Sequence, residues 1–349
     1  MAMKKKPNSN KPTWLVTADW HLTLRSQDEY RWTFLEWLSG VIQERNVRRL
    51  FLLGDLTDAK DCHSAELVNR IARYFTGLTR SITQDLHIYL LCGNHDYVDK
   101  ETPFFDFLSE YPNMYFFREP SVLDIDGRSV AFLPHGGDGP QLPKDKKFDF
   151  LFMHEIVSGA RTGNVELHAT ASGEVLSRAT EVLSGDVHWP QKVGRVTYVG
   201  APYPIVFGDD YTPRVMLRDV ESGAWHTLTP PTLRKHVVEA RPDQSLKKLL
   251  KNAKSGDQLK LRLVFDRRDF DSWNEIRQRF LDEADAMGLS VHGVELLAAE
   301  GQEELSQASD GKASTAGSAR QQLKRYVKEQ KVPSDVAAAG LALLEEVKP

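Results

Sequence analysis

Carboxylate, imidazole and amide side chains recur in five short clusters along this chain. The clusters read DWH at 19–21, GDLTD at 54–58, GNHD at 93–96, a single histidine at 154 and GDVH at 185–188. Each cluster alone is weak, because Asp and Asn are common in turns and a histidine after an apolar run is more often structural. Their joint occurrence in one chain indicates a common site. Oxygen and nitrogen ligands without a thiolate suit two hard or borderline divalent cations, manganese first.

The clusters follow segments that read as strands. The clearest is RLFLLGDLTD at 49–58, whose apolar residues Leu50–Leu53 are typical of a parallel strand buried on both faces. This strand delivers Asp55 at its carboxyl end, where open α/β sheets bind their ligands. A carboxylate buried there needs a cation. Two metal ions close together would share one carboxylate, and Asp55 is the natural bridge.

The remaining elements also predict an α/β fold. Apolar residues at helical spacing indicate one helix that contains Trp32, Leu35 and Leu38, and a second helix at Ala65–Thr79. Short apolar runs predict strands at Trp14–Ala18, His87–Cys92, Ser129–Pro134, Phe148–Met153, Val182–Leu183 and Val196–Val199, and a closing hairpin formed by Val215–Asp219 and Ala224–Leu228.

Length and composition bound the class of protein. A chain of 349 residues with 41% hydrophobic residues fits one large α/β domain with appendages. The net charge of −4 argues against a globally basic nucleic-acid binder, so any nucleic-acid contact must be local. Cys62 and Cys92 are too few for a disulfide framework and favour a reducing interior. We expect a disordered basic tail at 1–12, no signal peptide, no membrane span and a cytoplasmic location.

In type, order and spacing the clusters resemble the calcineurin-like metallophosphoesterase pattern D-x-H, G-D-x-x-D, G-N-H-D, H and G-H-x-H, across roughly residues 13–230. Within that family the chain is most similar to SbcD-type DNA-repair nuclease subunits in the short form found in tailed phages. NHDY at 94–97, the FFDFLSEYPNMYFF stretch after it and the VGAPYP turn at 199–204 carry this resemblance. The sequence departs from the pattern at Asp186, which stands where the family has a histidine. Either Asp186 ligates the second metal, which we favour, or its shorter side chain fails to reach.

The resemblance implies a role for each cluster. One metal would be held by Asp19, His21, Asp55 and His188, and the other by Asp55, Asn94, His154 and Asp186. His95 would be the catalytic histidine near the scissile phosphate, and Asp96 would orient it. The two metals, about 3.5–4 Å apart, would lower the pKa of a shared water that attacks phosphorus, while a protonated His95 donates to the leaving oxygen. The histidines predicted to be surface or packing residues are His63, His87, His135, His168, His226, His236 and His292.

The predicted nuclease domain spans 13–232, and the character of the sequence changes after Pro230–Pro231, where three further segments are predicted. Two strands, Leu259–Phe265 and Ser290–Leu297, enclose a helix that contains Trp273 and Met287, and this β-α-β unit resembles the small capping domain of the SbcD family, at 233–298. Residues 299–319 read as a flexible linker, and 320–349 as two short helices that need a partner to dock on. The candidate DNA contacts in the capping domain are Lys260, Arg262, Arg267 and Arg268, which we weigh equally against a solvated charged face.

The fold implied by the resemblance is a metallophosphoesterase β-sandwich flanked by helices, with the capping domain and a C-terminal helical tail. The implied function is that of a Mn²⁺- or Mg²⁺-dependent DNA nuclease subunit, an exonuclease on duplex ends and an endonuclease on single strands. It would act in DNA end processing, recombination and repair with an SbcC-type, SMC-like coiled-coil ATPase bound through 320–349, as a homodimer within a heterotetramer. The alternatives are a phosphodiesterase for a small nucleotide or phosphoprotein, and a metal-degenerate scaffold for the ATPase.

Overall fold

The computed structural model describes residues 13–82, 85–99, 101–137, 142–143, 145–171, 173–266, 269 and 272–298. The predicted basic tail, the linker at 299–319 and the helical segment at 320–349 lie outside these ranges. The chain divides into two units. The first unit contains the described residues up to Val238, together with Leu250–Lys260 and Ala284–Gly293. The second unit contains Glu239–Leu249 and the described residues of 261–283 and from 294 onward. Within the described ranges, no helix has the length and apolar character that a membrane crossing requires.

Six strands form a first mixed sheet in the order β14-β13-β1-β2-β3-β4. Their bounds are β1 Thr13–Thr17, β2 Val47–Leu53, β3 His87–Leu91, β4 Met114–Phe117, β13 Val215–Asp219 and β14 Trp225–Leu228. Strands β1 to β4 run parallel, whereas β13 pairs antiparallel with β1 and with β14. The parallel strand predicted from Leu50–Leu53 is confirmed, because β2 pairs in parallel with β1 and β3 and its last four residues are buried.

A second six-stranded sheet has the order β11-β12-β10-β7-β6-β5. Its strands are β5 Ser121–Ile125, β6 Arg128–Leu133, β7 Phe148–Met153, β10 Ala179–Ser184, β11 Gln191–Val193 and β12 Val196–Tyr198. The four inner strands β6, β7, β10 and β12 are parallel, and the two edge strands are antiparallel to their neighbours. Parallel inner strands in both sheets place several strand ends on one edge of each sheet.

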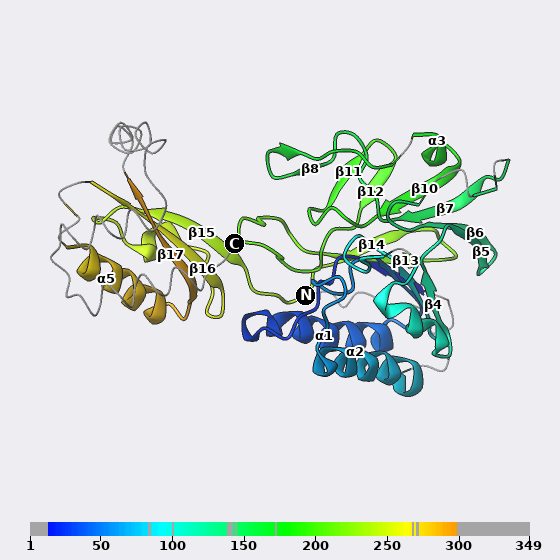
Figure 1. The fold of residues 1–349 in the computed structure, drawn as a ribbon, viewed down its shortest axis with the longest axis horizontal. Helices are drawn as coiled ribbons and strands as arrows, with labels where there is room; N and C mark the ends of the chain where they lie inside the picture. The colour runs from blue at the N-terminus through cyan, green and yellow to red at the C-terminus, as the bar shows by residue number, and fades with distance from the viewer. Residues whose placement is uncertain are drawn as a thin grey trace, which may run out of the picture. The chain divides into compact units, whose positions relative to one another are not determined.

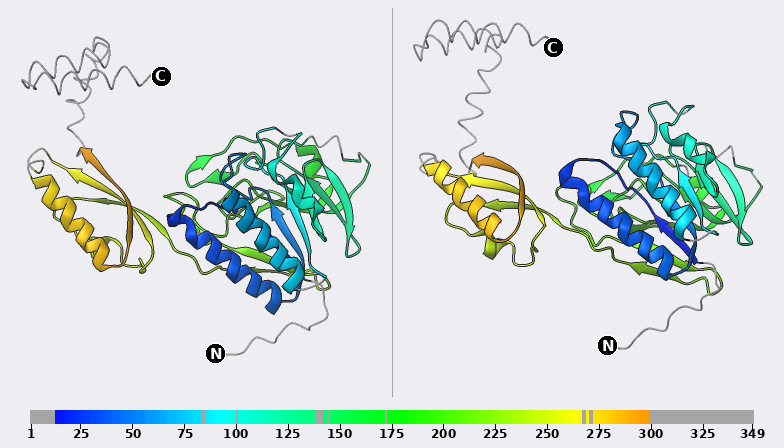
Figure 2. Two further views of the ribbon diagram at one scale, coloured as in Figure 1. Left: turned by 60° about the horizontal axis from the view of Figure 1, so that its bottom comes forward. Right: turned by 90° about the horizontal axis from the view of Figure 1, so that it is seen from below.

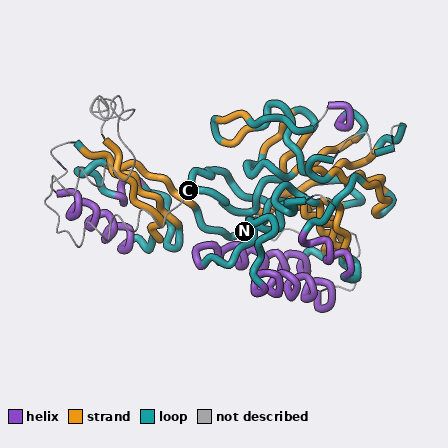
Figure 3. The backbone as a smooth tube through the Cα atoms, viewed as in Figure 1, coloured by secondary structure: helices purple, strands orange, loops and turns teal. Residues whose placement is uncertain are grey.

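Alternate side chains of β2 show how the layers are built. Leu50 and Leu52 belong to a core that the first sheet shares with the helices α1 and α2. Phe51 and Leu53 belong to the core between the two sheets, where the Phe51 ring centroid lies 4.7 Å from that of Phe152 on β7. Figures 1 and 2 show α1 and α2 side by side along the first sheet, and Figure 3 sets these helices, in purple, against the strands in orange. The expected sandwich of sheets flanked by helices is thus present.

The helices and shorter elements complete this unit. The helices are α1 Glu29–Glu44, α2 Ala65–Gly77 and α3 Gly173–Leu176, with 3-10 turns at Ser26–Asp28 and Phe104–Glu110 and a π-helical turn at Leu78–Ile82. Strands β8 Arg161–Thr162 and β9 Val165–Glu166 form a small hairpin. The helix predicted at Ala65–Thr79 therefore ends two residues earlier, where the π-helical turn takes over.

A three-stranded sheet of order β15-β16-β17 follows in the sequence. Its strands are β15 Lys235–Ala240, β16 Gln258–Phe265 and β17 Ser290–Ala298, with α4 Leu246–Leu249 and α5 Trp273–Ala286 between them in the chain. The predicted β-α-β order of β16, α5 and β17 is present, and β15 adds a strand that was not predicted. Figures 1 and 2 both draw α5 alongside these strands.

Candidate metal centre

The predicted metal ligands lie in the loops that follow the carboxyl ends of five parallel strands. Asp19 and His21 follow β1, Asp55 follows β2, Asn94 follows β3, His154 follows β7, and Asp186 and His188 follow β10. Contacts between side chains from both sheets, described next, bring the seven residues together as the sequence predicted.

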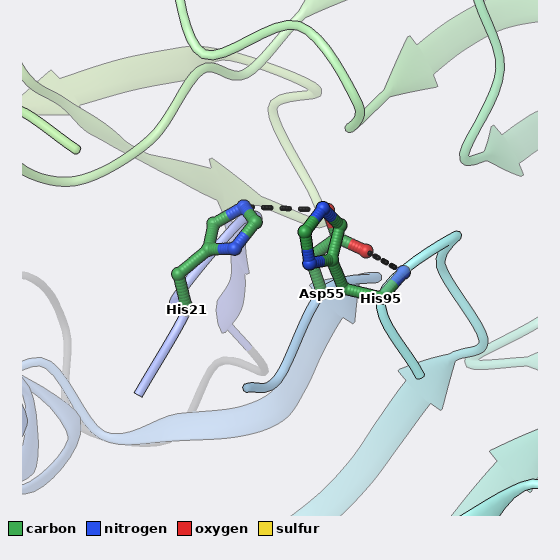
Figure 4. Close-up of side chains that lie close together, drawn as sticks. All are labelled: His21, Asp55 and His95. Atoms are coloured by element: carbon green, nitrogen blue, oxygen red, sulfur yellow. Dashed lines mark hydrogen bonds and ion pairs between the residues drawn. The ribbon is translucent and has the colours of Figure 1, made fainter. Parts of the chain in front are cut away.

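Asp55 is the centre of these contacts. Its Oδ2 lies 3.3 Å from His21 Nε2, and its Oδ1 lies 3.4 Å from His154 Nε2. The backbone N–H of His95 also donates to Oδ1, at 2.9 Å. Figure 4 shows His21, Asp55 and His95 with the contacts of Asp55 dashed. The candidate ligand atoms of His21, Asp55 and His95 lie within 4.8 Å of one another, as do those of Asp19, Asp55 and His154, so Asp55 belongs to both groups.

The imidazole of His154 is fixed in one orientation by a backbone carbonyl. Its Nδ1 lies 2.6 Å from the carbonyl oxygen of Leu53, and because a carbonyl can only accept, Nδ1 carries the hydrogen. This leaves Nε2 facing the carboxylate of Asp55. Burial opposes a charge on this ring, but the carboxylates of Asp55, Asp186 and Asp19 outweigh burial and raise the pKa of His154 to about 10.

Two glycines allow the His154 ring to come this close to the strand ends. A Cβ on Gly54 would lie 2.1 Å from His154 Nδ1. A Cβ on Gly185 would lie 2.0 Å from the carbonyl oxygen of Leu53 and 2.8 Å from His154 Nδ1. The glycines that begin the GDLTD and GDVH clusters are therefore required by the space around His154.

The side-chain amide of Asn94 lies against the imidazole of His154 and the carboxylate of Asp55. Its Oδ1 lies 3.1 Å from His154 Nε2. The same atom position is 3.1 Å from both carboxylate oxygens of Asp55, so that an amide turned over would donate to them. With its oxygen in place, Asn94 joins a set of oxygen and nitrogen lone pairs that converge on one point. A cation is the partner that satisfies all of them at once.

Asp19 is the most deeply buried acid of the set. Its side chain is fully inaccessible, Oδ1 accepts the backbone N–H of Asp186 at 3.0 Å, and Oδ2 has no hydrogen-bond partner in the described structure. Burial, reinforced by the charges of Asp55 and Asp186, raises the pKa of Asp19 well above its ordinary value. An orphaned carboxylate oxygen at full burial is costly unless a cation compensates it.

His21 and His188 meet through their Nε2 atoms, which are 3.2 Å apart. His21 Nδ1 lies 3.7 Å from Asp58 Oδ1. Burial, together with the nearby His21, lowers the pKa of His188 to about 3, so His188 is neutral and keeps a lone pair for a ligand role.

The backbone at this site is held in an uncommon conformation. Four of the predicted ligands have positive φ angles, in the left-handed region that residues other than glycine rarely adopt. The angles are 55° at Asp19, 43° at His21, 58° at Asp55 and 72° at Asp186. Such strain persists where surrounding structure fixes it, and it concentrates at functional sites. Four predicted ligands from three strand ends share this feature.

The donor set fits divalent metal ions. The Asp19 oxygen and the paired Nε2 atoms of His21 and His188 lack the positive partner that a metal would supply. Between Asp55, Asn94 and His154, a metal would take the place of the proton on His154 Nε2. Carboxylate, carboxamide and imidazole ligands without sulfur suit Mn²⁺ and Mg²⁺.

Asp186 reaches this cluster. Its Oδ1 lies 3.8 Å from His154 Nε2, and its side chain is largely buried. Its backbone N–H donates to Asp19 and so ties the end of β10 to the end of β1. The Asp186 carboxylate thus lies near the proposed ligand His154, and its role as a metal ligand stays a prediction.

His95 lies beside the cluster, and its ring is held by the carbonyl of Asp58. His95 Nδ1 lies 2.7 Å from that oxygen, which leaves Nε2 for other contacts. The structure gives Asp96 a different set of contacts from the predicted one, because its carboxylate accepts the backbone N–H groups of Gly93, Asp55 and Leu56 at 2.8, 2.8 and 2.9 Å. Asp96 thus fixes the loops that carry Asp55 and His95. Burial, together with the charge of Asp55, raises its pKa to about 7.

One residue at the site was assigned elsewhere from the sequence. His135 was predicted to be a surface or packing residue, but its Nδ1 lies 3.9 Å from Asp186 Oδ2. The signal that could have found it is its position just after a predicted strand, as for the proposed ligands. His63 fits its predicted packing role, since its ring centroid lies 4.4 Å from that of Phe104.

Two of the predicted DNA contacts, Lys260 and Arg262, belong to β16. Arg262 is paired with two acids, at 3.5 Å from Glu239 and 3.0 Å from Glu295. These ion pairs favour the solvated charged face over phosphate binding for Arg262. Lys260 is half-buried in β16, and Arg267 and Arg268 lie outside the described residues.

Comparisons with known proteins agree with this site. The family model of the calcineurin-like phosphoesterases matches residues 13–213. "Exonuclease subunit 1" of Enterobacteria phage T4 is 22% identical over 218 residues, which cover 57% of this chain and 62% of that protein. This chain therefore matches less than two thirds of that relative's length.

Two solved structures are also similar, at low identity. One is the Pseudomonas putida nuclease MPE, with a TM-score of 0.33 and 18% identity, and the match covers 62% of this chain and 87% of that one. The other is Plasmodium GAP50, described as the anchor in the inner membrane complex, with a TM-score of 0.34 and 10% identity, and the match covers 65% of this chain and 91% of that one. The family model covers more than half of the chain, including every predicted metal ligand. This chain belongs to the calcineurin-like phosphoesterase family.

Proposed function

We propose that this protein is a divalent-metal-dependent DNA nuclease subunit that hydrolyses phosphodiester bonds as an exonuclease on duplex ends and an endonuclease on single strands. The observation that carries the proposal is the convergence of lone pairs on Asp55, with a fully buried Asp19 oxygen left without a partner. A hydrolase of the calcineurin-like phosphoesterase family needs this kind of site. Family membership and the donor chemistry both support two metal ions, with Mn²⁺ preferred.

The ligands are assigned as the sequence suggested. Asp19, His21, Asp55 and His188 would hold one ion, and Asp55, Asn94, His154 and Asp186 the other. When bound, the pair would supply positive charge to the phosphate oxygens and lower the pKa of water between them. Asp55 faces His21 with one carboxylate oxygen and His154 with the other, which supports its role as the shared ligand.

His95 is assigned the proton-donor role. Its Nδ1–H is used by the Asp58 carbonyl, so Nε2 is the nitrogen that can give a proton to the leaving oxygen of the substrate. Asp58 is itself held by an ion pair of 2.8 Å with Arg25. Asp96 positions His95 through the backbone of the loop, since the Asp96 carboxylate accepts the N–H of Gly93, two residues before His95.

The choice of nucleic acid as substrate rests on the phage relative. That protein is named as an exonuclease subunit, which supports a nuclease that assembles with another subunit. We propose that the partner is a coiled-coil ATPase of the SbcC type, bound through residues 320–349, in a heterotetramer built on a dimer of this chain. The sheet of β15, β16 and β17 is proposed as the capping domain, at 233–298, and the whole is proposed to work in DNA end processing, recombination and repair in the cytoplasm.

The test is a cleavage assay with purified full-length protein on end-labelled linear duplex DNA and on circular single-stranded DNA. Each substrate is incubated with Mn²⁺, Mg²⁺ or a chelator, with and without the ATPase. We expect Mn²⁺-dependent cleavage of both substrates. Cyclic nucleotides and phosphopeptides serve as competing substrates. Cleavage of these small substrates with both DNA substrates left intact would favour a small-molecule phosphodiesterase, and no hydrolysis of any substrate would favour a scaffold.

A further inference from the structure

His135 lies at a strand end that the proposed ligand set does not use. It follows β6, which pairs in parallel with β7, the strand that delivers His154. The ring centroids of His135 and His154 are 6.0 Å apart, and His135 Nδ1 lies 3.3 Å from the backbone carbonyl oxygen of His154. Because a carbonyl oxygen can only accept, His135 Nδ1 carries the hydrogen in this contact. This N–H group, already directed at the His154 carbonyl, lies at the edge of the metal centre.

Two carboxylates flank that N–H group. His135 Nδ1 lies 3.9 Å from Asp186 Oδ2 and 3.9 Å from Glu155 Oε2. Glu155 is only 2% exposed, its Oε1 accepts the backbone N–H of Gly136, and its Oε2 has no hydrogen-bond partner in the described structure. Two carboxylates at a buried site repel each other unless a donor or a cation lies between them. His135 Nδ1 is the ring atom that lies 3.9 Å from each of these carboxylates.

The two carboxylate oxygens of Asp186 face different histidines. Oδ1 faces His154 Nε2 at 3.8 Å, on the side of the metal ligands, whereas Oδ2 faces His135 Nδ1. A metal-binding side chain is commonly oriented by a hydrogen bond to the atom that does not bind the metal, and loss of that partner weakens metal affinity. The usual pair is a histidine ligand held by a carboxylate. Here the types are exchanged, and at 3.9 Å the contact of His135 with Asp186 is electrostatic rather than a hydrogen bond.

We propose that His135 is a positioning residue for Asp186, holding one carboxylate oxygen so that the other is presented to the second metal ion. The inference rests on the metal centre proposed above. It also accounts for the departure of this chain from the family pattern. An imidazole at position 186 would bring its own neutral nitrogen, whereas a carboxylate adds a negative charge that the N–H dipole of His135 can offset.

The test is Mn²⁺ binding by titration calorimetry on the full-length protein without DNA. His135→Phe keeps a ring and removes the donor, His135→Ala removes both, and His135→Gln keeps a donor. We expect His135→Phe and His135→Ala to weaken one of two Mn²⁺ sites about 10- to 100-fold, and His135→Gln to retain most of the affinity. The exposed His168, replaced by Ala, is the matched control and should bind Mn²⁺ as the unaltered protein does.

The same substitutions are repeated in an Asp186→His background. There we expect His135→Phe to change Mn²⁺ affinity less than about threefold, because no carboxylate remains to be held. Unchanged Mn²⁺ affinity in His135→Phe, or an equal loss in both backgrounds, would overturn the proposal. Either His135→Phe or His135→Ala suffices if the other does not fold. The readout contains no DNA, so a protein that binds Mn²⁺ as described but cuts no DNA would refute the nuclease assignment alone.

Discussion

His154 donates its Nδ1–H to the backbone carbonyl of Leu53 at 2.6 Å, and this bond across the two sheets decides which imidazole nitrogen faces Asp55. Leu53 ends β2 in the first sheet, and His154 follows β7 in the second. The bond leaves a single nitrogen, Nε2, for either a proton or a metal ion. The competition between the two gives the first prediction.

Mn²⁺ binding should release protons near neutral pH. In the metal-free protein the pKa of His154 is raised to about 10, because the carboxylates of Asp55, Asp186 and Asp19 outweigh the effect of burial. A metal ion needs the neutral ring, so it must displace this proton at every pH below about 10, and Mn²⁺ affinity should rise with pH across that range. Burial also raises the pKa of Asp19, which adds to the release.

The measurement is the proton count from calorimetry in buffers of different ionisation enthalpy at pH 7. His154→Gln should release fewer protons than the unaltered protein and bind Mn²⁺ more weakly. His188 should contribute none, since its pKa is lowered to about 3. Mn²⁺ binding with no proton release at pH 7 would contradict this account.

Gly185→Ala should destabilise the fold and disturb the site. The new Cβ would lie 2.0 Å from the carbonyl oxygen of Leu53, which is backbone and cannot move aside cheaply. We expect a loss of about 1–3 kcal/mol in the free energy of unfolding, measured by chemical denaturation, together with weaker Mn²⁺ binding.

The matched control is Gly40→Ala, in the exposed part of α1, where an added Cβ would meet nothing within 4 Å. Alanine in a helix interior should stabilise the protein by about 0.5–1 kcal/mol. If both substitutions had the same effect, the close approach of Gly185 and Leu53 would have no energetic importance.

Much of the site was predictable because its signals are local. An apolar run such as Leu50–Leu53 identifies a buried strand by itself, and the residue types after each strand identify metal-ligand chemistry. The position of His135 after a strand is a local signal, but its contact with Asp186 is not, because that depends on β6 and β10 both lying beside β7 in the second sheet. Sequence alone could not supply that strand order.

Two other features were missed for physical reasons. Asp96 was expected to orient His95, but the route through backbone N–H groups of the neighbouring loops depends on the fold and has no signal in the sequence. Strand β15, Lys235–Ala240, has the sequence KHVVEA and is only partly buried, so its apolar pattern is too short to stand out. Its pairing with β16 is a tertiary effect.

The residue at position 186 should set the pH dependence of catalysis. Asp186→Ala should lose nuclease activity, because the second metal loses a ligand. Asp186→His should remain active and shift the rising limb of the pH–rate profile to lower pH. With one negative charge fewer around the ions, water between them becomes more acidic. The profiles are measured with saturating Mn²⁺, and a normal rate and metal requirement in Asp186→Ala would show that Asp186 is not a ligand.

Deletion of 321–349 should separate catalysis from assembly. The segment follows a polar linker in the sequence, so its loss should leave Mn²⁺-dependent cleavage of simple DNA substrates within about twofold while abolishing binding to the ATPase. Binding is measured by co-purification and by calorimetry with the isolated ATPase. A truncated chain that still binds the ATPase at full affinity would place the docking site elsewhere.

Asp55→Asn tests the shared ligand, because Asp55 faces His21 through one carboxylate oxygen and His154 through the other. The decisive measurement is the Mn²⁺-dependent cleavage rate of labelled linear duplex DNA by this variant, with circular dichroism recorded on the same sample. We predict an unchanged circular dichroism spectrum and a cleavage rate lower by about 10³-fold or more, since charge stabilisation by both ions would be lost. Cleavage by Asp55→Asn at the rate of the unaltered protein would contradict a metal centre bridged by Asp55.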